Sequence, residues 1–493
     1  MTATPVAARP ITHLNFDNSY ARLPDTFHAS ATAAPLPDPE LVHFNVEVAA
    51  LLDLDPSEGA RAELVRYCAG EEPIPGSQPV AMAYAGHQFG QFVPSLGDGR
   101  ALLLGEVVNE AGARWDLHLK GSGPTQFARG FDGRSVLRSA IREYVAGEAL
   151  HGLGIPTTRA LAIVASSEPV LRERMERAAA LLRVAESHVR FGTFEWFAAR
   201  GDRSGLSQLT EYLIARHFPQ WRERADRDFL LLREAVTRTA TLVARWQAVG
   251  FTHGVLNTDN MSILGLTLDF GPYGFMDQYQ RAFVSNHSDP LGRYAFQRQP
   301  AIAYWNVEAL ATAIDPLLER GQAEDALAAF APTFSQTLAT LFRAKLGFQD
   351  ARDDDAALVS DLLEIMEEVG ADFTLSFRGL GGITQLADAR GVVGLLPRQE
   401  WRDAWLRRYR ARLASEAGDD AERQVRMDAA NPVYVLRQWL AQRAIGSAER
   451  GDYSEIETLL RLLRQPFVPL PGADAYASPP PPHLVSPQIT CSS

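Results

Sequence analysis

The spacing of apolar residues divides the chain into a strand-rich part and a helical part. Residues 101–108 and 115–120 are β-prone apolar runs separated by a turn at 110–113, which predicts adjacent strands. From residue 206 to about residue 463 the apolar positions mostly recur at helical spacing. The pattern therefore predicts an α+β protein whose C-terminal half is mostly helical.

Shorter segments follow from the same pattern. A helix is expected around residues 41–52, a strand over 157–165, and a further strand or strand–helix junction over 184–191. From Pro466 onward the chain is rich in proline, with four consecutive prolines at 479–482, and is expected to be extended or mobile.

One predicted helix carries regularly spaced charges. Ser135 is a good N-cap, and apolar residues at helical spacing follow it until Gly152. Arg134, Arg138 and Arg142 recur every four residues along this segment. Most of these arginines are expected on a solvated face, as is usual for charges at this spacing.

Composition narrows the class of protein. The chain has 493 residues and a net charge of −12, from 48 Lys and Arg against 60 Asp and Glu, so neither a nucleic-acid coat nor a membrane-surface protein is indicated. No run approaches the ~18 apolar residues of a membrane span, and the first residues lack the apolar core of a signal peptide. Cys68 and Cys491 alone cannot build a disulfide framework or a cysteine zinc site. A cytoplasmic protein is expected.

Two loops rich in metal-ligand chemistry lie close together in the sequence. HGVLNTDN (residues 253–260) is followed by an apolar run at 263–268, interpreted as a short strand of a buried hairpin, and then by Asp269 in a DFG tripeptide. In kinase-like phosphotransferases a catalytic-loop Asn and the DFG Asp hold Mg²⁺. Asn260 follows the histidine by the spacing of H-R-D-x-x-x-x-N, but Val255 stands where that pattern has its catalytic Asp.

Asp259 stands next to Asn260 in this loop and is the nearest carboxylate that could act as the base. The alternative interpretation is an Asn- and Asp-rich loop that caps the following strand, with DFG as an ordinary turn. Because both loops occur together across a short segment, we favour the kinase-like metal site over this alternative.

A glycine turn and a lysine point in the same direction. Gly97 and Gly99 flank a turn before the first long strand, and Lys120 ends the next one, twenty residues beyond Arg100. Alone, the glycines fit an ordinary hairpin turn, but a glycine turn followed by a strand-borne Lys is how kinases bind nucleotide phosphates. Glu143, 23 residues after Lys120 on the predicted helix, is the candidate ion-pair partner of that lysine.

Arg183 and Arg190 flank the segment predicted at 184–191 and lie near apolar residues 191–194, in an otherwise acidic protein. Guanidinium groups bind phosphates through bidentate contacts, so these two arginines are candidates for a phosphate clamp. Structural pairing with carboxylates explains them equally well from the sequence alone.

The chain resembles the selenoprotein O (SelO/YdiU) family over most of its length. The resemblance is carried by GHQFGQFVPSLGDGRA, DLHLKGSGPTQFARGFDGRSVLRSAIREY, HGVLNTDNMSI, DFGPYGF and NPVYVLRQWLAQ. It implies a protein-kinase-like two-lobed fold with N-terminal and C-terminal extensions. The regions expected are an N-terminal extension (1–78), an N-lobe (79–200), a C-lobe (201–330), a helical region (331–465) and a Pro-rich tail (466–493).

The same resemblance implies a protein adenylyltransferase, which binds ATP in a flipped orientation and transfers AMP to Ser, Thr or Tyr hydroxyls with release of pyrophosphate. It implies Asp259 as proton acceptor, Asn260 and Asp269 as ligands of Mg²⁺ or Mn²⁺, and Glu143 as partner of the lysine. The nucleotide-binding residues that it implies are Gly97, Gly99, Arg100, Lys120, Asp132, Gly133, Arg183, Arg190, Asp269 and Glu143. Its partners would be ATP and protein substrates, redox-related proteins among them, and a monomer is expected.

Two other functions remain open at this point. One is a kinase with a relocated base that transfers phosphate, and the other is an inactive scaffold that binds ATP. The retained Lys120, Glu143, Asn260 and Asp269 argue against the scaffold. The resemblance also places Cys491 where eukaryotic members carry selenocysteine, and Ser285 where some bacterial members have its partner cysteine, so a free thiol is expected at Cys491.

Overall fold

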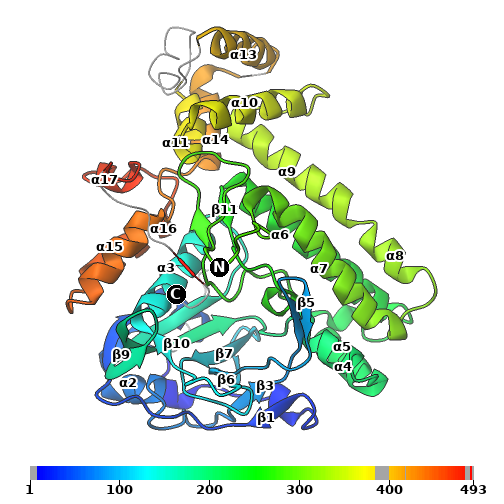
Figure 1. Ribbon diagram of the computed structural model, residues 1–493, viewed down its shortest axis with the longest axis vertical. Helices are drawn as coiled ribbons and strands as arrows, with labels where there is room; N and C mark the ends of the chain where they lie inside the picture. Colours follow the sequence, from blue (N-terminus) through cyan, green and yellow to red (C-terminus); the bar gives the residue numbers. More distant parts are fainter. Residues whose placement is uncertain (1–7, 383–398, 417, 483–488, 491–493) are drawn as a thin grey trace.

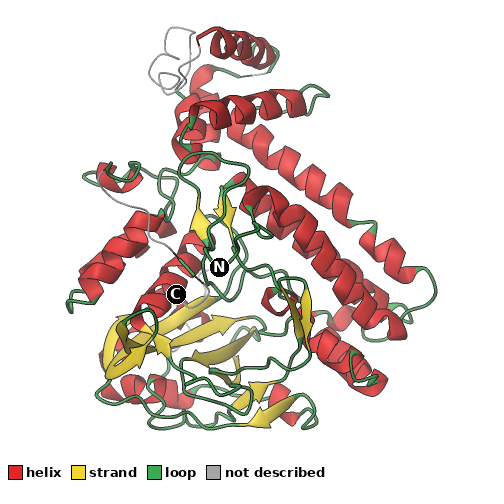
Figure 2. Cartoon of the chain, in the orientation of Figure 1, coloured by secondary structure: helices red, strands yellow, loops and turns green. Residues whose placement is uncertain are grey.

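The computed structural model describes residues 8–382, 399–416, 418–482 and 489–490. It combines an antiparallel sheet, built from the first part of the chain, with a helical C-terminal half (Figures 1 and 2). The sequence-based prediction of an α+β protein with a mostly helical C-terminal half is confirmed.

One large sheet organises the first two hundred residues. Its strands follow the order β1, β3, β6, β7, β10, β9 and β2, with β8 also paired to β10, and every pairing is antiparallel. The bounds are β1 His28–Ser30, β2 Glu40–Phe44, β3 Val80–Met82, β6 Ala101–Val108, β7 Arg114–Lys120, β8 Ser135–Val136, β9 Arg159–Leu171 and β10 Met175–Ala185. The segment before residue 79 thus supplies β1 and β2, which form the two edges of the sheet.

Helices cover both faces of this sheet. Side chains alternate between the faces along a strand, so Ala179 and Leu181 of β10 pack with α3 (Leu137–Gly152), while Ala180 and Leu182 pack on the opposite side. The opposite side is covered by α1 (Val46–Leu51) and α2 (Ala62–Cys68). The sheet is therefore buried on both faces, and α3 is fixed against it.

The rest of the chain is mainly helical. The remaining helices are α4 Phe191–Ala198, α5 Arg203–His217, α6 Arg227–Ala248, α7 Gln299–Ile314, α8 Gln322–Leu327, α9 Phe330–Leu346, α10 Asp355–Val369, α11 Phe373–Leu380, α13 Gln399–Leu413, α14 Asp420–Ala430, α15 Gln438–Ala448, α16 Ser454–Arg464 and α17 Asp474–Ala477. Two short hairpins complete the fold, β4 (Gly86–Gln88) with β5 (Gln91–Val93) and β11 (Phe251–Thr252) with β12 (Gly274–Phe275).

The helices after α8 pack in three places, one of which is the contact of α9 with α6. α9, α10, α11, α13 and α14 enclose a separate hydrophobic core, to which Met276 and Tyr279 also contribute. α15 and α16 return to pack against α3, beside the sheet (Figure 1). The C-terminal half therefore supports the outer side of the helix that carries Glu143.

Two predicted elements differ from the structure at their beginnings. The segment predicted as a helix over 41–52 starts as strand β2, and α1 begins only after Asn45, whose side chain caps it by accepting from the backbone N–H groups of Glu47 and Val48. Ser135 is not the N-cap of α3. It pairs with β10 in the short strand β8, and Val136 precedes the helix without a side-chain cap.

The apolar run at 263–268 is not a strand. The chain reverses there, so that Met261 and Thr267 form an isolated bridge, and Gly265 has a positive φ of 69° beside Arg238 of α6. A strand cannot continue through that turn. The apolar side chains are buried because the turn packs against the neighbouring helices.

The three evenly spaced arginines do not form a solvated face: Arg134 precedes β8, and Arg138 and Arg142 lie on α3. Arg134 and Arg142 are buried, Arg142 lies 4.5 Å from the ring centroid of Tyr273, and Arg138 pairs with Glu176. The prediction failed because the return of α15 and of the loop around Tyr273 covers this side of the helix.

The described end of the chain lies against the segment around residue 287. The backbone N–H of His287 donates to the Ile489 carbonyl at 2.8 Å. Cys491 and its predicted free thiol lie outside the described residues, whereas Cys68 is a buried free thiol. Within the described ranges, none of the helices has both the length and the apolar character that crossing a membrane requires.

Lys345 is a buried cation in the core of the helical half. It is 4% exposed, and its Nζ lies 4.8 Å from the ring centroid of Phe377 and 5.8 Å from that of Phe373. Burial lowers the pKa of Lys345 to about 7. The unfolded chain therefore binds more protons than the folded protein between about pH 7 and pH 10, and this lysine makes stability rise with pH in that window.

We expect Lys345→Met to stabilise the protein by about 2–4 kcal/mol below pH 7 and by little near pH 10, because it removes the cost of burying the charge. Thermal unfolding of both proteins across this range measures the difference. Arg343→Met, a neighbouring change on α9, is the control and should show no such pH dependence. An equal gain for Lys345→Met at every pH would contradict the assignment.

Candidate active site

Lys120 and Glu143 meet where the end of β7 faces the middle of α3. Lys120 pairs with Ala101 of β6 and Leu181 of β10 in the sheet register, so its backbone is held from both sides. Its Nζ donates to Oε2 of Glu143 at 2.6 Å, and both residues are buried. The ion pair suggested by the sequence is present.

Asp269 lies between Arg183 and Arg190, the two arginines whose role the sequence left open. Arg183 of β10 donates through Nη2 to Oδ1 of Asp269 at 2.5 Å, and through Nε to Oε1 of Glu143 at 2.5 Å. Arg190, which precedes α4, donates through Nη1 to Oδ2 of Asp269 at 2.5 Å. In this structure both arginines are paired with carboxylates, as the structural interpretation expects, and the pairing gathers them at one point.

The charges at this point favour an additional anion. Burial alone would raise the pKa of Asp269, but Arg183, Arg190 and Lys120 together hold it well below its usual range. Burial, assisted by Arg183, lowers the pKa of Lys120 to about 8. The cluster contains three cationic side chains and two carboxylates, so it carries excess positive charge.

Asp259 and Asn260 approach the cluster from the loop after β11. The backbone carbonyl of Asp259 accepts from Nη1 of Arg190 at 2.7 Å, and Nδ2 of Asn260 donates to the Val255 carbonyl at 3.0 Å. Asp259 is 6% exposed, and burial raises its pKa to about 7. The histidine of the same loop is structural: His253 is buried, and its Nε2 lies 3.0 Å from the Leu268 carbonyl.

The glycine turn packs against a neighbouring loop. Gly97 has a φ of 63°, and an added Cβ would collide with the Phe127 ring. At Gly99 a Cβ would lie 2.9 Å from the Phe127 carbonyl oxygen. Close protein packing therefore explains both glycines, while Arg100, which ends the turn, is exposed and interacts electrostatically with Asp269 and Glu143.

Asp132 and Gly133 are not bonded to the cluster. Asp132 pairs with Arg172, with Nη1 to Oδ2 at 2.6 Å and Nη2 to Oδ1 at 2.8 Å, and this pairing lowers its pKa. Gly133, at a φ of 67°, lies against the backbone at Gly123 and Pro124. These residues instead order the loop that covers the glycine turn.

Residues that sequence reasoning left without a role also contact the site. The Arg190 guanidinium lies 4.5 Å from the Tyr84 ring centroid, and Gln88 donates to the Asp259 carboxylate. Both residues fall in or beside the block AYAGHQFGQF, but neither stands in a spacing that predicts contact with residues 259 or 190. Only the path of the chain brings them there.

The donor atoms suit a hard divalent cation. Mg²⁺ and Mn²⁺ prefer oxygen ligands, and Mg²⁺ sites commonly use one or two carboxylates together with substrate phosphates. Asp269 supplies a carboxylate, and the Val255 carbonyl fixes the amide nitrogen of Asn260, which leaves the amide oxygen as a possible ligand. The described residues contain no group of three or more His, Cys, Asp or Glu side chains that could hold a metal by themselves.

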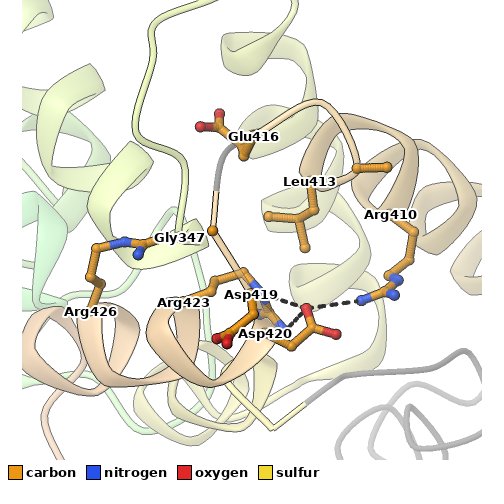
Figure 3. Close-up of a pocket in the computed structure, with 10 residues that line it drawn as sticks. Gly347, Arg410, Leu413, Glu416, Asp419, Asp420, Arg423 and Arg426 are labelled. Atoms are coloured by element: carbon orange, nitrogen blue, oxygen red, sulfur yellow. Dashed lines mark hydrogen bonds and ion pairs between the residues drawn. The ribbon is translucent and has the colours of Figure 1, made fainter.

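A polar cavity lies elsewhere, at the junction of α13 and α14 (Figure 3). Its volume is about 300 Å³, and none of the residues lining it is a predicted site residue. Asp420 lies 3.0 Å from Arg423 and 3.6 Å from Arg410, so these cations are already paired. This cavity is therefore separate from the positively charged cluster around Asp269.

Comparisons with known proteins define the class. The family model described as "Protein adenylyltransferase SelO" matches residues 10–464. A protein nucleotidyltransferase YdiU of Myxococcus xanthus is 53% identical over 97% of this chain and 99% of its own. Similar proteins of that name from Thioalkalivibrio sulfidiphilus and Azotobacter vinelandii are 52% and 49% identical, over 97% and 98% of this chain and 99% of their own.

The chain is therefore a nucleotidyltransferase. More particularly, it belongs to the SelO family of protein adenylyltransferases, as the resemblance of its motifs predicted.

The packing of the glycine turn can be tested by its response to a single methyl group. We expect Gly97→Ala to destabilise the protein by more than the ~1–2 kcal/mol that a positive φ costs an alanine, because its Cβ also collides with Phe127. Gly112→Ala is the matched control, since its φ is 79° and nothing lies within 4 Å of the added carbon. Equal losses in denaturant unfolding would show that Phe127 can move away.

Proposed function

We propose that the cluster around Asp269 binds the phosphates of ATP and that Asp259 assists transfer of AMP to Ser, Thr or Tyr hydroxyls of proteins. The observation that carries the proposal is the convergence of Lys120, Arg183 and Arg190 beside Asp259, at a centre with excess positive charge. An activity that breaks the bond between the α- and β-phosphates needs cations at the leaving pyrophosphate.

The arginines are suited to receive phosphate because they are already desolvated and fixed. Arg183 and Arg190 are 2% and 1% exposed, and Tyr84 lies below the Arg190 guanidinium. Phosphate oxygens would replace Asp269 as partners of both guanidinium groups, while Lys120 remains held by Glu143. Exposed Arg100 and the ordered loop at Gly97, Gly99, Asp132 and Gly133 would then cover the nucleotide.

Asp259 would take the proton of the acceptor. The hydroxyl oxygen attacks the α-phosphorus, its proton passes to the Asp259 carboxylate, and the bond to the β-phosphate oxygen breaks as pyrophosphate leaves. The raised pKa of Asp259, about 7, keeps proton transfer close to balanced at neutral pH.

Asn260 and Asp269 would hold Mg²⁺ or Mn²⁺, which would supply positive charge at the α-phosphate. The chain's own part is to orient these two ligands: Val255 fixes the Asn260 amide, and the arginines hold Asp269 until nucleotide binds.

The fold that accompanies this function is proposed to be kinase-like and two-lobed. The arrangement that supports it is a lysine strand paired to a helix glutamate, facing a loop with a DFG aspartate. The regions 1–78, 79–200, 201–330, 331–465 and 466–493 are proposed as its parts. Protein substrates, redox-related proteins among them, and a monomeric state are part of the same proposal.

The transferred group can be read directly from the label that stays on protein. Incubated with ATP and Mg²⁺ or Mn²⁺, the protein should modify itself or lysate proteins with label from the α-phosphate and none from the γ-phosphate. Retention of γ-label alone would make it a kinase, the second candidate, which the kinase-like pairing of Lys120 with Glu143 supports. No retention of either label would leave an ATP-binding scaffold.

Removing single charges tests the site, with unfolding measured alongside because Asp269 also pairs with two buried arginines. Lys120→Ala and Asp269→Ala should each lower AMP transfer by at least ~100-fold, as the loss of one electrostatic contact to a transition state does. Lys345→Met is the control for Lys120, because these are the only two lysines of the chain and both are buried. Near-normal transfer by a well-folded Lys120 or Asp269 variant would place the site elsewhere.

A further inference from the structure

The β4–β5 hairpin stands outside the main sheet and reaches the loop that carries Asp259. It pairs only with itself in the strand order, with His87 opposite Phe92 and Gln88 opposite Gln91. The chain leaves the sheet after β3 for this hairpin and returns to it at β6. Its residues are therefore free to contact something other than the sheet.

Three consecutive hairpin residues bond to three consecutive loop residues. Nε2 of Gln88 donates to Oδ2 of Asp259 at 3.0 Å. The backbone N–H of His87 donates to Oγ1 of Thr258 at 2.7 Å, and that of Phe89 to Oδ1 of Asn257 at 3.2 Å. These three hydrogen bonds dock the hairpin on residues 257–259.

Two further side chains, one on α4 and one in the turn that precedes α7, also fix this docking. Glu195 of α4 accepts hydrogen bonds from both the His87 ring and the Thr258 hydroxyl. The Tyr294 hydroxyl donates to Oδ1 of Asn257 at 2.5 Å and accepts from the backbone N–H of Phe89 at 2.9 Å. Hairpin and loop are consequently held to a common support.

The hairpin backbone closes over the other side of the Asp259 carboxylate. A Cβ added at Gly86 would lie 2.8 Å from Oδ1 and 2.9 Å from Cβ of Asp259. Oδ1 is buried and has no hydrogen-bond partner among the residues that the structure describes. Gly86 thus limits one side of the carboxylate, while Gln88 provides the side-chain hydrogen bond on the other.

We propose that Gln88 is a positioning residue for AMP transfer, which holds the Asp259 carboxylate in the orientation that receives the acceptor proton. This inference rests on the proposed function, because it takes Asp259 as the base. A short aspartate side chain is free to rotate about two bonds, and a single directed hydrogen bond selects one orientation. Gln88 acts through Asp259: among the residues that the structure describes, its side-chain hydrogen bond goes to Asp259 and not to Lys120, Arg183 or Arg190.

The alternative is that Gln88 only helps to hold the hairpin in place. That role is already shared by the bonds of His87 and Phe89 and by Glu195 and Tyr294. Loss of the Gln88 amide should therefore leave the hairpin docked and disturb the carboxylate alone.

The test is a comparison of kcat and KM for ATP in α-label transfer, using the full chain. Gln88→Met keeps the length of the side chain and removes the donor, so kcat should fall about 10-fold with KM and the unfolding temperature unchanged. Gln91→Met is the matched control, since Gln91 is the exposed partner of Gln88 across the hairpin, and it should behave as the unaltered protein does. Gly86→Ala should also lower kcat, because its methyl group displaces Asp259.

Each outcome of this test supports or overturns either the positioning role or the proposed function. Normal kcat for Gln88→Met, or an equal loss for Gln91→Met, would overturn the positioning role while the proposed function stands. A raised KM for ATP or a lowered unfolding temperature in Gln88→Met would assign Gln88 a structural role and also overturn it. Absence of α-label transfer by the unaltered protein would instead sink the proposed function.

Discussion

The ion pairs of half-buried Asp269 with two buried arginines are the interaction on which the arrangement of the site depends. Asp269 receives Arg183 from the sheet and Arg190 from the start of α4, although its own backbone has a φ of 58°, which is unfavourable for a non-glycine residue. Guanidinium groups as buried as those of Arg183 and Arg190 are tolerated only when their partners are in place. The sheet, α4 and the loop after residue 268 must therefore adopt their relative positions together.

Helix α3 transmits this requirement to the rest of the fold through two adjacent residues. Glu143 pairs with Lys120 and Arg183 on the side of the sheet. Arg142 donates to the Tyr273 carbonyl and to Gln438 of α15, on the side of the C-terminal half. Neighbouring helix residues point about 100° apart, so one turn of α3 joins the site to both parts of the protein.

The sequence allowed prediction where chemistry and local pattern coincide. The strands around residues 101–108 and 115–120 and the pairing of Lys120 with Glu143 follow from periodicity and from a known spacing. It did not allow prediction of the turn at 263–268, because an apolar run is compatible with any buried conformation and only the positive φ of Gly265 breaks it. The contact of Gln88 with Asp259 could not be predicted for a different reason. The two residues are 171 positions apart, and the docked hairpin brings them together.

Under the proposed function, a triphosphate would compete with Asp269 for the two arginines. Each uses a guanidinium nitrogen within 2.5 Å of an Asp269 oxygen, and that carboxylate is also the proposed metal ligand. A cation held by Asp269 would favour phosphate binding, because it would neutralise the carboxylate that the arginines release. Without the cation, Asp269 would keep Lys120, whose Nζ lies 4.0 Å away, while Arg183 would keep Glu143. The same contacts that order the free protein would thus couple its proposed binding of ATP to binding of the metal.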